Sequence, residues 1–262
     1  MSDPGDPFEI ICEIEPPTRP DLMHVRHQIG VLSEVASSFL VPDNHLGRAT
    51  VSSVAVAHEV ELVGGRAIAC LNARDRNLLG FRRDMLTAAA YGVDQFLFVY
   101  GDRPKSGART GQLTVRSMIE ELRTNPPVRP DGSHRPFRVG VSAGPGPLPA
   151  WKQEADFLCA QVRFSLHEFV EWRAGITFDG PVYAGVMVVP SVRMARQLSA
   201  EIPELTVPDG WLGIIEREPD GGVKLACELV EAVQASGAFH GVHLIPVSKY
   251  REVARRLEER DT

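Results

Sequence analysis

Short apolar runs alternate along the chain with longer segments in which apolar residues recur at helical spacing. The apolar runs predict strands at Phe8–Ile14, Phe39–Val41, Ala67–Leu71, Gln95–Tyr100, Phe137–Ser142, Phe157–Gln161, Val182–Val188 and Gly241–Ile245. The segments between them predict helices at Leu22–Ser37, Thr50–Leu62, Arg76–Tyr91, Leu113–Arg123, Leu166–Arg173, Val192–Ala200, Val223–Ala235 and Lys249–Glu259. Each predicted strand therefore leads into a predicted helix, an alternation typical of α/β folds.

Such strand–helix units, without a sequence repeat or a long linker, predict a parallel (β/α)8 barrel, the TIM barrel, closed by a C-terminal helix. We expect residues 1–262 to form this barrel as a single domain, since such barrels reach about 250 residues as one unit. The connection between the fifth and sixth strands is shortened, because Ala143–Ala155 contains Gly-Pro-Gly-Pro-Leu-Pro and is too short for a crossover helix. The seventh connection is long, and Val207–Ile215 is expected to add a short helix there.

The composition is that of an ordinary soluble globular protein. Hydrophobic residues make up 44% and charged residues 24% of the chain, which excludes whole-chain disorder, a collagen-like repeat and a coiled coil. The net charge of −6 and the sequence pI of about 5.8 argue against nucleic acid as the main partner. Small anionic metabolites remain open as ligands.

The sequence shows no targeting or membrane signal. Residues 1–7 are polar and rich in Asp, Pro and Gly, unlike a signal peptide, and no apolar run approaches the roughly 20 residues of a membrane span. The 4 cysteines lie in apolar surroundings without Cys-x-x-Cys spacing, which is typical of buried, reduced thiols. We therefore expect a cytoplasmic protein that does not associate with membranes.

Polar side chains mark the carboxyl ends of the predicted strands, where (β/α)8 barrels carry their active sites. They are Glu13, Glu15, Asp43, Asn44, Asn72, Arg74, Asp75, Asp102, Gln161 and His243. A carboxylate in such a position often caps a helix or orders a loop instead of taking part in catalysis. Asp43 and Asp75 are the clearest candidates for that structural role, since each precedes a predicted turn or helix.

Three of these side chains form a candidate catalytic constellation. Glu13 ends the apolar run Ile10–Cys12 at the barrel mouth, and loss of hydration there favours the protonated carboxyl that a general acid needs near neutral pH. Asp102 follows the fourth strand and suits an electrostatic role. Gln161 ends the sixth strand, and its amide can both donate and accept, as recognition of a heteroaromatic ring requires.

Several other site patterns do not occur in the sequence. No Gly-rich phosphate loop or dinucleotide fingerprint follows a strand, and the 8 histidines show no HxxxH or HExxH spacing. We therefore expect neither a Rossmann-type nucleotide site nor a catalytic metal.

Five short motifs, in order along the predicted strands, resemble those of the methylenetetrahydrofolate reductase family. They are Glu13-Ile14-Glu15-Pro16-Pro17 after the first strand, Val41–Ala49 after the second, Ala73-Arg74-Asp75-Arg76-Asn77 after the third, Tyr100-Gly101-Asp102-Arg103-Pro104 after the fourth, and Ala155–Gln161 in the sixth. Together they extend the resemblance over nearly the whole chain.

The resemblance implies an oxidoreductase of one-carbon metabolism and methionine biosynthesis, which reduces 5,10-methylenetetrahydrofolate to 5-methyltetrahydrofolate with NADH or NADPH. It implies that Glu13 protonates the folate N10, that Asp102 orients the pterin and supports the cation, and that Gln161 hydrogen-bonds the pterin edge. It further implies a set of binding residues, which are Asp43 and Asn44 for substrate and Asn72, Asp75 and Tyr100 for cofactor. The expected partner is a small folate molecule, and a homo-oligomer is compatible with these features.

Departures from the family pattern concern its FAD. The family holds the flavin with a His at the third strand, a Tyr and a Ser-Asp pair at the fourth helix, and a His and a Lys between the fifth and sixth strands. This chain has Cys70, the run Gln112–Arg116 and the shortened Ala143–Ala155 at those places. The resulting hypothesis is a hydride passed directly from NAD(P)H without flavin, with the FAD-dependent reaction as an alternative.

Two further alternatives belong to other functional classes. One is a non-catalytic folate-binding barrel or regulatory subunit, in which the same losses reflect decay. The other is a barrel that acts on a different one-carbon carrier, such as a corrinoid-linked methyltransferase or a deazaflavin-dependent reductase. For a folate ligand, we expect the basic loop residues Arg48, Arg103 or Arg163 to bind the anionic polyglutamate tail.

Overall fold

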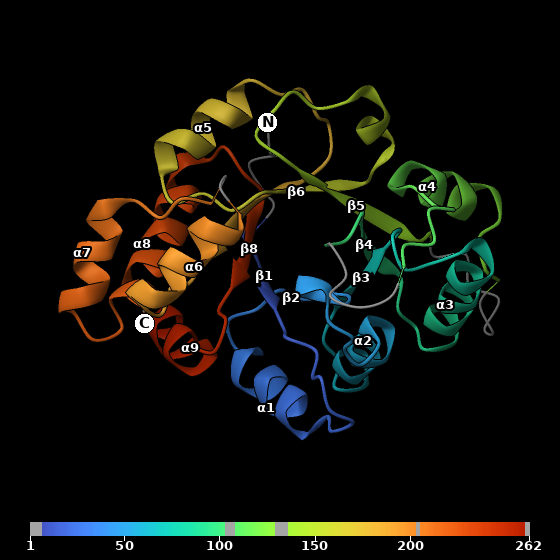
Figure 1. The fold of residues 1–262 in the computed structure, drawn as a ribbon, viewed down its shortest axis with the longest axis horizontal. Helices are drawn as coiled ribbons and strands as arrows, with labels where there is room; N and C mark the ends of the chain where they lie inside the picture. Colours follow the sequence, from blue (N-terminus) through green and yellow to red (C-terminus); the bar gives the residue numbers. More distant parts are fainter. Residues whose placement is uncertain (1–6, 103–107, 129–135, 203–204, 260–262) are drawn as a thin grey trace.

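A computed structural model of the chain describes residues 7–102, 108–128, 136–202 and 205–259. Within these ranges, parallel strands close into a barrel in chain order from β1 to β8, so the predicted TIM barrel is confirmed (Figure 1). The strands are β1 (Glu9–Glu13), β2 (Ser38–Val41), β3 (Ala67–Asn72), β4 (Gln95–Val99), β5 (Arg138–Ala143), β6 (Phe157–Ala160), β7 (Val182–Met187) and β8 (Gly241–Ile245).

Helices surround the ring of strands, as Figure 1 shows. They are α1 (Met23–Leu32), α2 (Ser53–Leu62), α3 (Leu78–Ala90), α4 (Val115–Thr124), α5 (Leu166–Ala174), α6 (Val192–Glu201), α7 (Asp209–Arg217), α8 (Gly221–Ser236) and α9 (Tyr250–Glu258). Two short 3-10 helices, η1 (His45–Gly47) and η2 (Ala150–Glu154), lie in connections. The predicted extra helix of the seventh connection is α7. None of the helices in the described ranges is both long and apolar enough to cross a bilayer.

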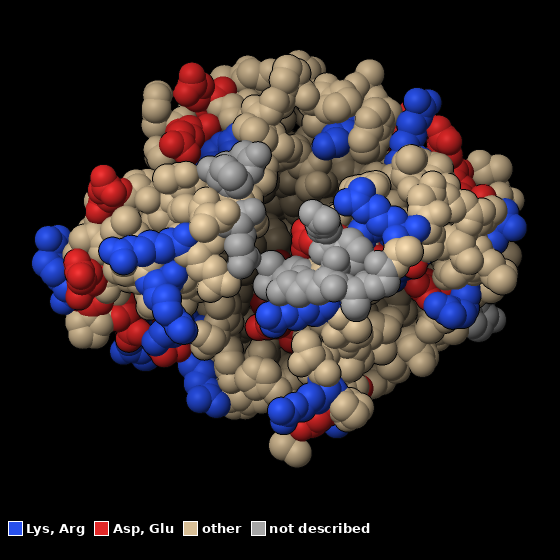
Figure 2. Space-filling model, viewed as in Figure 1, with Lys and Arg blue, Asp and Glu red and all other residues tan. Residues whose placement is uncertain are grey.

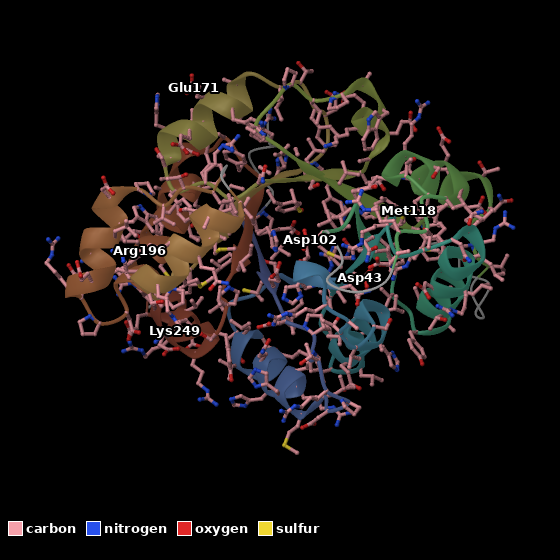
Figure 3. The ribbon with its side chains drawn as sticks, in the orientation of Figure 1. Asp43, Asp102, Met118, Glu171, Arg196 and Lys249 are labelled. Atoms are coloured by element: carbon pink, nitrogen blue, oxygen red, sulfur yellow. The ribbon has the colours of Figure 1, made fainter. Side chains whose placement is uncertain are left out.

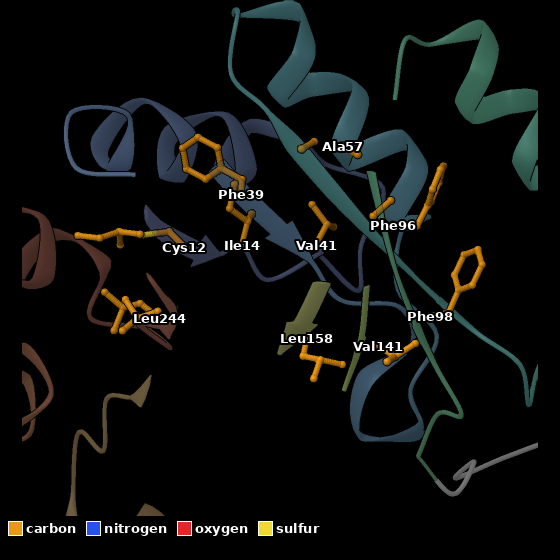
Figure 4. Packing of buried hydrophobic residues seen from close by; sticks show 14 of the residues in the cluster. Cys12, Ile14, Phe39, Val41, Ala57, Phe96, Phe98, Val141, Leu158 and Leu244 are labelled. Atoms are coloured by element: carbon orange, nitrogen blue, oxygen red, sulfur yellow. The ribbon is translucent and has the colours of Figure 1, made fainter. Parts of the chain in front are cut away.

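The alternation of side chains along each strand divides the core into an inner and an outer layer. The inner layer fills the barrel and consists of Ile11, Leu40, Ile68, Cys70, Leu97, Phe157, Cys159 and Tyr183. The neighbours of these residues point outward beneath the helices, and Figure 4 shows part of this outer layer, including Cys12, Phe39, Val41, Phe96, Leu158 and Leu244. Because both faces of each strand are buried, the strands appear in the sequence as continuous apolar runs.

The connection between β5 and β6 carries no crossover helix, as the sequence predicts. It contains only η2, and the prolines ahead of η2 do not permit a longer helix. The strands themselves approach closely at this point. A Cβ placed on Gly140 of β5 would lie 2.1 Å from the ring of Phe157 on β6, so this position accepts only glycine.

Helix boundaries differ from the predicted ones where tertiary contacts compete with helical hydrogen bonds. Helix α1 ends at Leu32 and does not reach Ser37, because the Ser37 backbone N–H donates to the Ile10 carbonyl at 2.8 Å beside β1. Asp75 was expected to cap the third helix or to form a turn, and it lies in the turn before α3 without capping it. Asn77 caps α3, since its side-chain oxygen accepts from the Gly80 N–H at 2.8 Å.

Candidate active site

Glu13 and His243 meet at the barrel mouth. Ile11 of β1 is aligned with His243 of β8, and Glu13 lies two residues further along the same inward face. Its Oε2 atom is 3.1 Å from Nε2 of His243, and both side chains are largely buried. A carboxyl group is therefore held in a fixed position at the end of the barrel where (β/α)8 enzymes carry out their chemistry.

Glu15 and His45 form a second carboxylate–imidazole pair near Glu13. Nε2 of His45, on η1, is 3.6 Å from Oε1 of Glu15, which follows β1. The contact with His45 holds the pKa of Glu15 below its usual value. The same contact raises the pKa of His45, and the negative charges of Glu13 and Asp102 add to that shift. These four side chains therefore lie within electrostatic reach of one another.

Asp102 follows β4 and is labelled near the centre of the ring of strands in Figure 3. The Asp75 carboxylate raises the pKa of Arg74, and Asp102 and Asp43 contribute in the same direction. Several carboxylates thus act on the mouth, and Figure 2 shows acidic atoms within the hollow of this face and basic atoms around it. Arg103 and Pro104, which complete the turn predicted after β4, lie outside the described residues.

Asp43 and Asn72 are joined in a buried network that ties β2 to β3. The Asp43 carboxylate accepts hydrogen bonds from the backbone N–H of Asn72 at 3.0 Å and from its side-chain amide at 2.6 Å. It also pairs with Arg76, whose guanidinium reaches Asp84 at 2.8 Å. The Asp43 side chain is only 4% exposed. In this arrangement Asp43 orders the loops below the mouth, while its contact with substrate stays a prediction.

Asn44 and Asp75 belong to an adjoining network. Asn44 has a left-handed backbone with φ of 49°, and its side-chain amide donates to Asp75 at 3.3 Å. Arg74 donates to both Asp75 oxygens at 2.7 and 2.5 Å, and its side chain is 1% exposed. Within the described part of the chain, the Nη1 atom of Arg74 has no hydrogen-bond partner.

Gln161 and Tyr100 lie at the rim with different surroundings. The Gln161 side-chain amide makes no hydrogen bond to the residues that the structure describes, and its Oε1 lies beside Gly144, where a Cβ would be 3.6 Å away. Its donor and acceptor are therefore available to a ligand. Tyr100 is half exposed, and its hydroxyl accepts from Arg109 at 3.4 Å.

An apolar slot of about 360 Å³ opens directly beside Glu13. One wall carries Glu13, Glu15 and His45. The opposite wall comes from the ends of β7 and β8 and from α6, and its apolar residues are Met187, Met194, Leu198, Ile202 and Ile245. A slot with this composition suits a flat, neutral aromatic group, because methionine side chains pack well against ring edges.

The remaining expectations about reactive groups concern cysteines and metals. All four cysteines are free and buried, as predicted. Burial raises the pKa of Cys12 and of Cys159 to about 12. Among the described residues, no three His, Cys, Asp or Glu side chains are grouped as metal ligands.

The sequence pointed to His243 as one of the polar strand ends but gave it no role. Its pairing with Glu13 depends on closure of the barrel, which makes β1 and β8 neighbours. Alignment of β1 with β8, the first and last strands of the chain, would have placed Glu13 near His243. The Glu15–His45 pair and the apolar slot were also missed, because both depend on how loops and α6 fold over the mouth.

No protein-family model matches this chain, and no curated protein does. Solved structures share its fold over nearly the full length. An uncharacterized protein from Clostridium thermocellum that binds two copies of 5-methyl-5,6,7,8-tetrahydrofolic acid has a TM-score of 0.63 and 12% identity, and the match covers 97% of this chain and 96% of that one. A mutant tryptophan synthase α-subunit from Pyrococcus furiosus has a TM-score of 0.55 and 12% identity, with 96% of each chain covered.

A third structure of this kind is riboflavin lyase with modified FMN and riboflavin, with a TM-score of 0.54, 10% identity, and 97% of this chain and 92% of that one covered. Identities this low show a shared fold and no more. What this barrel does therefore depends on the side chains at its own mouth.

Proposed function

We propose that the protein reduces 5,10-methylenetetrahydrofolate to 5-methyltetrahydrofolate with NADH or NADPH. The observation that carries this proposal is the Glu13 carboxyl, held by His243 and open to the apolar slot. The barrel from Clostridium thermocellum supports it, because a protein of the same fold binds two copies of the reaction product.

Glu13 performs the first step as a general acid. The five-membered ring of the substrate opens when the bond between its methylene carbon and N10 breaks, and N10 leaves as a neutral amine only if it gains a proton. The Glu13 carboxyl supplies that proton and leaves a cationic iminium at N5. The slot beside Glu13 receives the aromatic ring attached to N10, and the hydrogen bond from His243 keeps the carboxyl aimed at it.

The second step is transfer of a hydride to the iminium carbon. Asp102 supports the cation by its negative charge, and the free amide of Gln161 hydrogen-bonds the pterin edge. A hydride from the nicotinamide forms the methyl group and leaves the oxidised dinucleotide. One proton and one hydride are consumed in each turnover, and Glu13 regains its proton from solvent.

The side chains at the three flavin positions of the family do not fit FAD. Cys70 lies in the inner layer of the barrel and is only 4% exposed. Gln112 accepts from the Leu78 backbone N–H at 3.1 Å, and a capping box at the start of α4 engages the backbone N–H groups of Thr114 and Ser117. These groups are already engaged within the protein, which supports hydride transfer without flavin.

The β5–β6 connection supports the same conclusion. In this connection Lys152 donates to the Ser142 carbonyl at 2.6 Å. Its ammonium is therefore turned toward the end of β5, where it stabilises the shortened loop. No step of the proposed reaction requires a flavin.

The test combines the visible absorption spectrum of purified protein with NADH oxidation by methylenetetrahydrofolate, with and without added FAD. We expect colourless protein, turnover without FAD, and at least about 100-fold lower turnover in Glu13→Gln with binding of 5-methyltetrahydrofolate retained. Glu34→Gln, which neutralises an exposed carboxylate after α1, serves as the control and keeps wild-type activity.

Each other outcome contradicts a defined part of the proposal. A stoichiometric flavin in the purified protein overturns the flavin-free reaction and leaves the FAD-dependent one. No turnover under either condition, with folate binding retained, indicates a non-catalytic folate-binding homologue. Unchanged turnover in Glu13→Gln removes the acid role of Glu13.

A further inference from the structure

A second recess lies between α5 and the segment that leads into α7. It is a cleft of about 530 Å³ and contains a single basic side chain, Arg163, among its lining residues. Its walls are formed mainly by Val162, Phe164, Trp172, Thr206 and Pro208. A volume of this size is within the range of roughly 300–1,000 Å³ that small-molecule sites occupy.

Arg163 is held in this cleft by two aromatic rings. Its guanidinium lies over the rings of Trp172 and Phe169, with distances to the ring centroids of 5.4 and 5.9 Å. Burial lowers the pKa of Arg163, and the charge of Glu168 opposes that shift. Its side chain nevertheless forms no hydrogen bond and no ion pair with a residue that the structure describes. Arg74 and Arg76 at the mouth, by contrast, are both paired with carboxylates.

A guanidinium that has lost part of its hydration and lacks a partner is a ready site for an oxyanion. Its planar N–H groups match two oxygens of a phosphate or a carboxylate. The rings of Trp172 and Phe169 fix its orientation, so little conformational entropy remains to be lost on binding.

The cleft is joined to the candidate active site through Gly144. The indole N–H of Trp172 donates to the Gly144 carbonyl at 2.9 Å. Gly144 in turn lies beside the Gln161 side-chain oxygen. The wall of the cleft at Trp172 therefore adjoins the rim of the candidate site at Gln161.

We infer that this cleft binds the phosphate-bearing part of the dinucleotide donor, with its pyrophosphate on Arg163. The inference rests on the proposed function, which requires two ligands at one mouth. Each recess has two glutamates among its lining residues, and an arginine is found only among those of the cleft. Glu13 and Glu15 line the slot and repel phosphates, so the slot suits the neutral aromatic part of the folate. The cleft offers the cation that a pyrophosphate needs.

Two carboxylates, Glu168 and Glu171, also line the cleft. The inference therefore also predicts how donor affinity changes when a negative charge is removed. Glu168 and Glu171 lie on the exposed side of α5, and Figure 3 shows Glu171 on that helix. Their charges repel a bound phosphate across solvent. Neutralising Glu168 should therefore strengthen donor binding, while neutralising Arg163 should weaken it.

The experiment titrates the full-length protein with NADH and follows NADH fluorescence, in the absence of folate. Arg163→Gln should raise the Kd for NADH at least about tenfold, as loss of a charge-assisted hydrogen bond does. Glu168→Gln should lower it about twofold, because the two charges act across a screened distance. Arg196→Gln, which removes an exposed charge on α6, is the control and should leave the Kd unchanged.

Binding of inorganic pyrophosphate and of 5-methyltetrahydrofolate shows whether the cleft binds the phosphates of the dinucleotide or the carboxylates of the folate. Pyrophosphate should displace NADH from the wild-type protein and lose this effect in Arg163→Gln. The affinity for 5-methyltetrahydrofolate should be the same in both proteins. Loss of folate affinity with NADH affinity preserved would assign Arg163 to the glutamyl carboxylates and overturn the dinucleotide assignment.

The NADH-binding test of the cleft and the turnover test of the proposed function can fail independently of each other. If the wild-type protein does not reduce the folate but binds NADH in an Arg163-dependent manner, the proposed function is wrong and the cleft assignment stands. If it reduces the folate and Arg163→Gln binds NADH normally, only the cleft assignment is wrong. Failure of both NADH and pyrophosphate to bind the wild-type protein also overturns the assignment.

Discussion

The Glu13 carboxylate lies 3.1 Å from the His243 imidazole, although 230 positions separate the two residues in the chain. The contact exists because β1 and β8 hydrogen-bond to each other and close the barrel. It gives the carboxyl a defined orientation toward the slot. In the proposed reaction His243 is thus a positioning residue for the acid.

Replacement of His243 tests that relationship. His243→Leu removes the hydrogen bond, and we expect kcat to fall about tenfold, the equivalent of one hydrogen bond, with little change in KM for the folate. His243→Gln retains a donor and should recover most of the rate. Urea unfolding of each variant checks that the barrel remains intact. A rise in KM without a fall in kcat would indicate a substrate contact instead of a positioning role.

The buried pair of Asp43 and Arg76 predicts a stability effect. Asp43→Ala leaves the Arg76 guanidinium without its buried carboxylate, and removal of one partner from such a pair costs about 3–5 kcal/mol. Asp84→Asn weakens a more exposed contact of the same guanidinium and should cost less. Urea denaturation measures both free energies of unfolding. A cost for Asp43→Ala no larger than that for Asp84→Asn would show that the network is not essential to the fold.

The Glu15–His45 pair predicts a pH dependence of stability. The pKa of His45 is raised above its usual 6.5, so its stabilising contribution is fully present below pH 6.5 and is lost as pH rises through the folded-state pKa. The pKa of Glu15 is lowered from 4.5, so its contribution is present above pH 4.5 and is lost as pH falls through the folded-state value. The pair therefore contributes most between pH 4.5 and 6.5.

Thermal unfolding of His45→Gln across pH measures this contribution. The Tm difference from wild type should be largest in that window and should disappear in alkaline solution. It should correspond to less than about 1 kcal/mol, because the Glu15 side chain is 60% exposed and solvent screens the pair. His167→Gln, which removes a histidine that is 87% exposed, is the control and should follow the wild-type profile. A constant Tm difference at every pH would exclude titration of His45 as the cause.

The buried thiols predict inertness toward a disulfide reagent. A thiol reacts as its thiolate, and burial raises the pKa of Cys12 and of Cys159 to about 12. We expect no rapid reaction of the native protein with Ellman's reagent and reaction of all 4 cysteines after denaturation. Rapid labelling of one thiol in the native protein would show that its strand or helix opens readily.

Several features of the fold follow from sequence pattern alone. The apolar runs identified every strand of the described barrel, because strands buried on both faces show no polar interruptions. The Pro-rich segment after β5 indicated the missing crossover helix, since proline excludes helix locally. Helix ends were less predictable. Helix α1 ends before Ser37, whose backbone N–H donates to the Ile10 carbonyl, and α3 begins after the cap Asn77. Local propensity reveals neither boundary.

The sequence by itself determined the (β/α)8 class and the group of polar side chains at the carboxyl ends of its strands, because both depend on residues that are near one another in the chain. Only the tertiary structure decided which of those side chains contact one another. Barrel closure brings Glu13 to His243, and loop packing joins Asp43 to Arg76. The packing of α5 holds Arg163 over the rings of Trp172 and Phe169, with no ion pair to a residue that the structure describes. Such pairings depend on distances between remote segments, which a local pattern of apolar and polar residues does not encode.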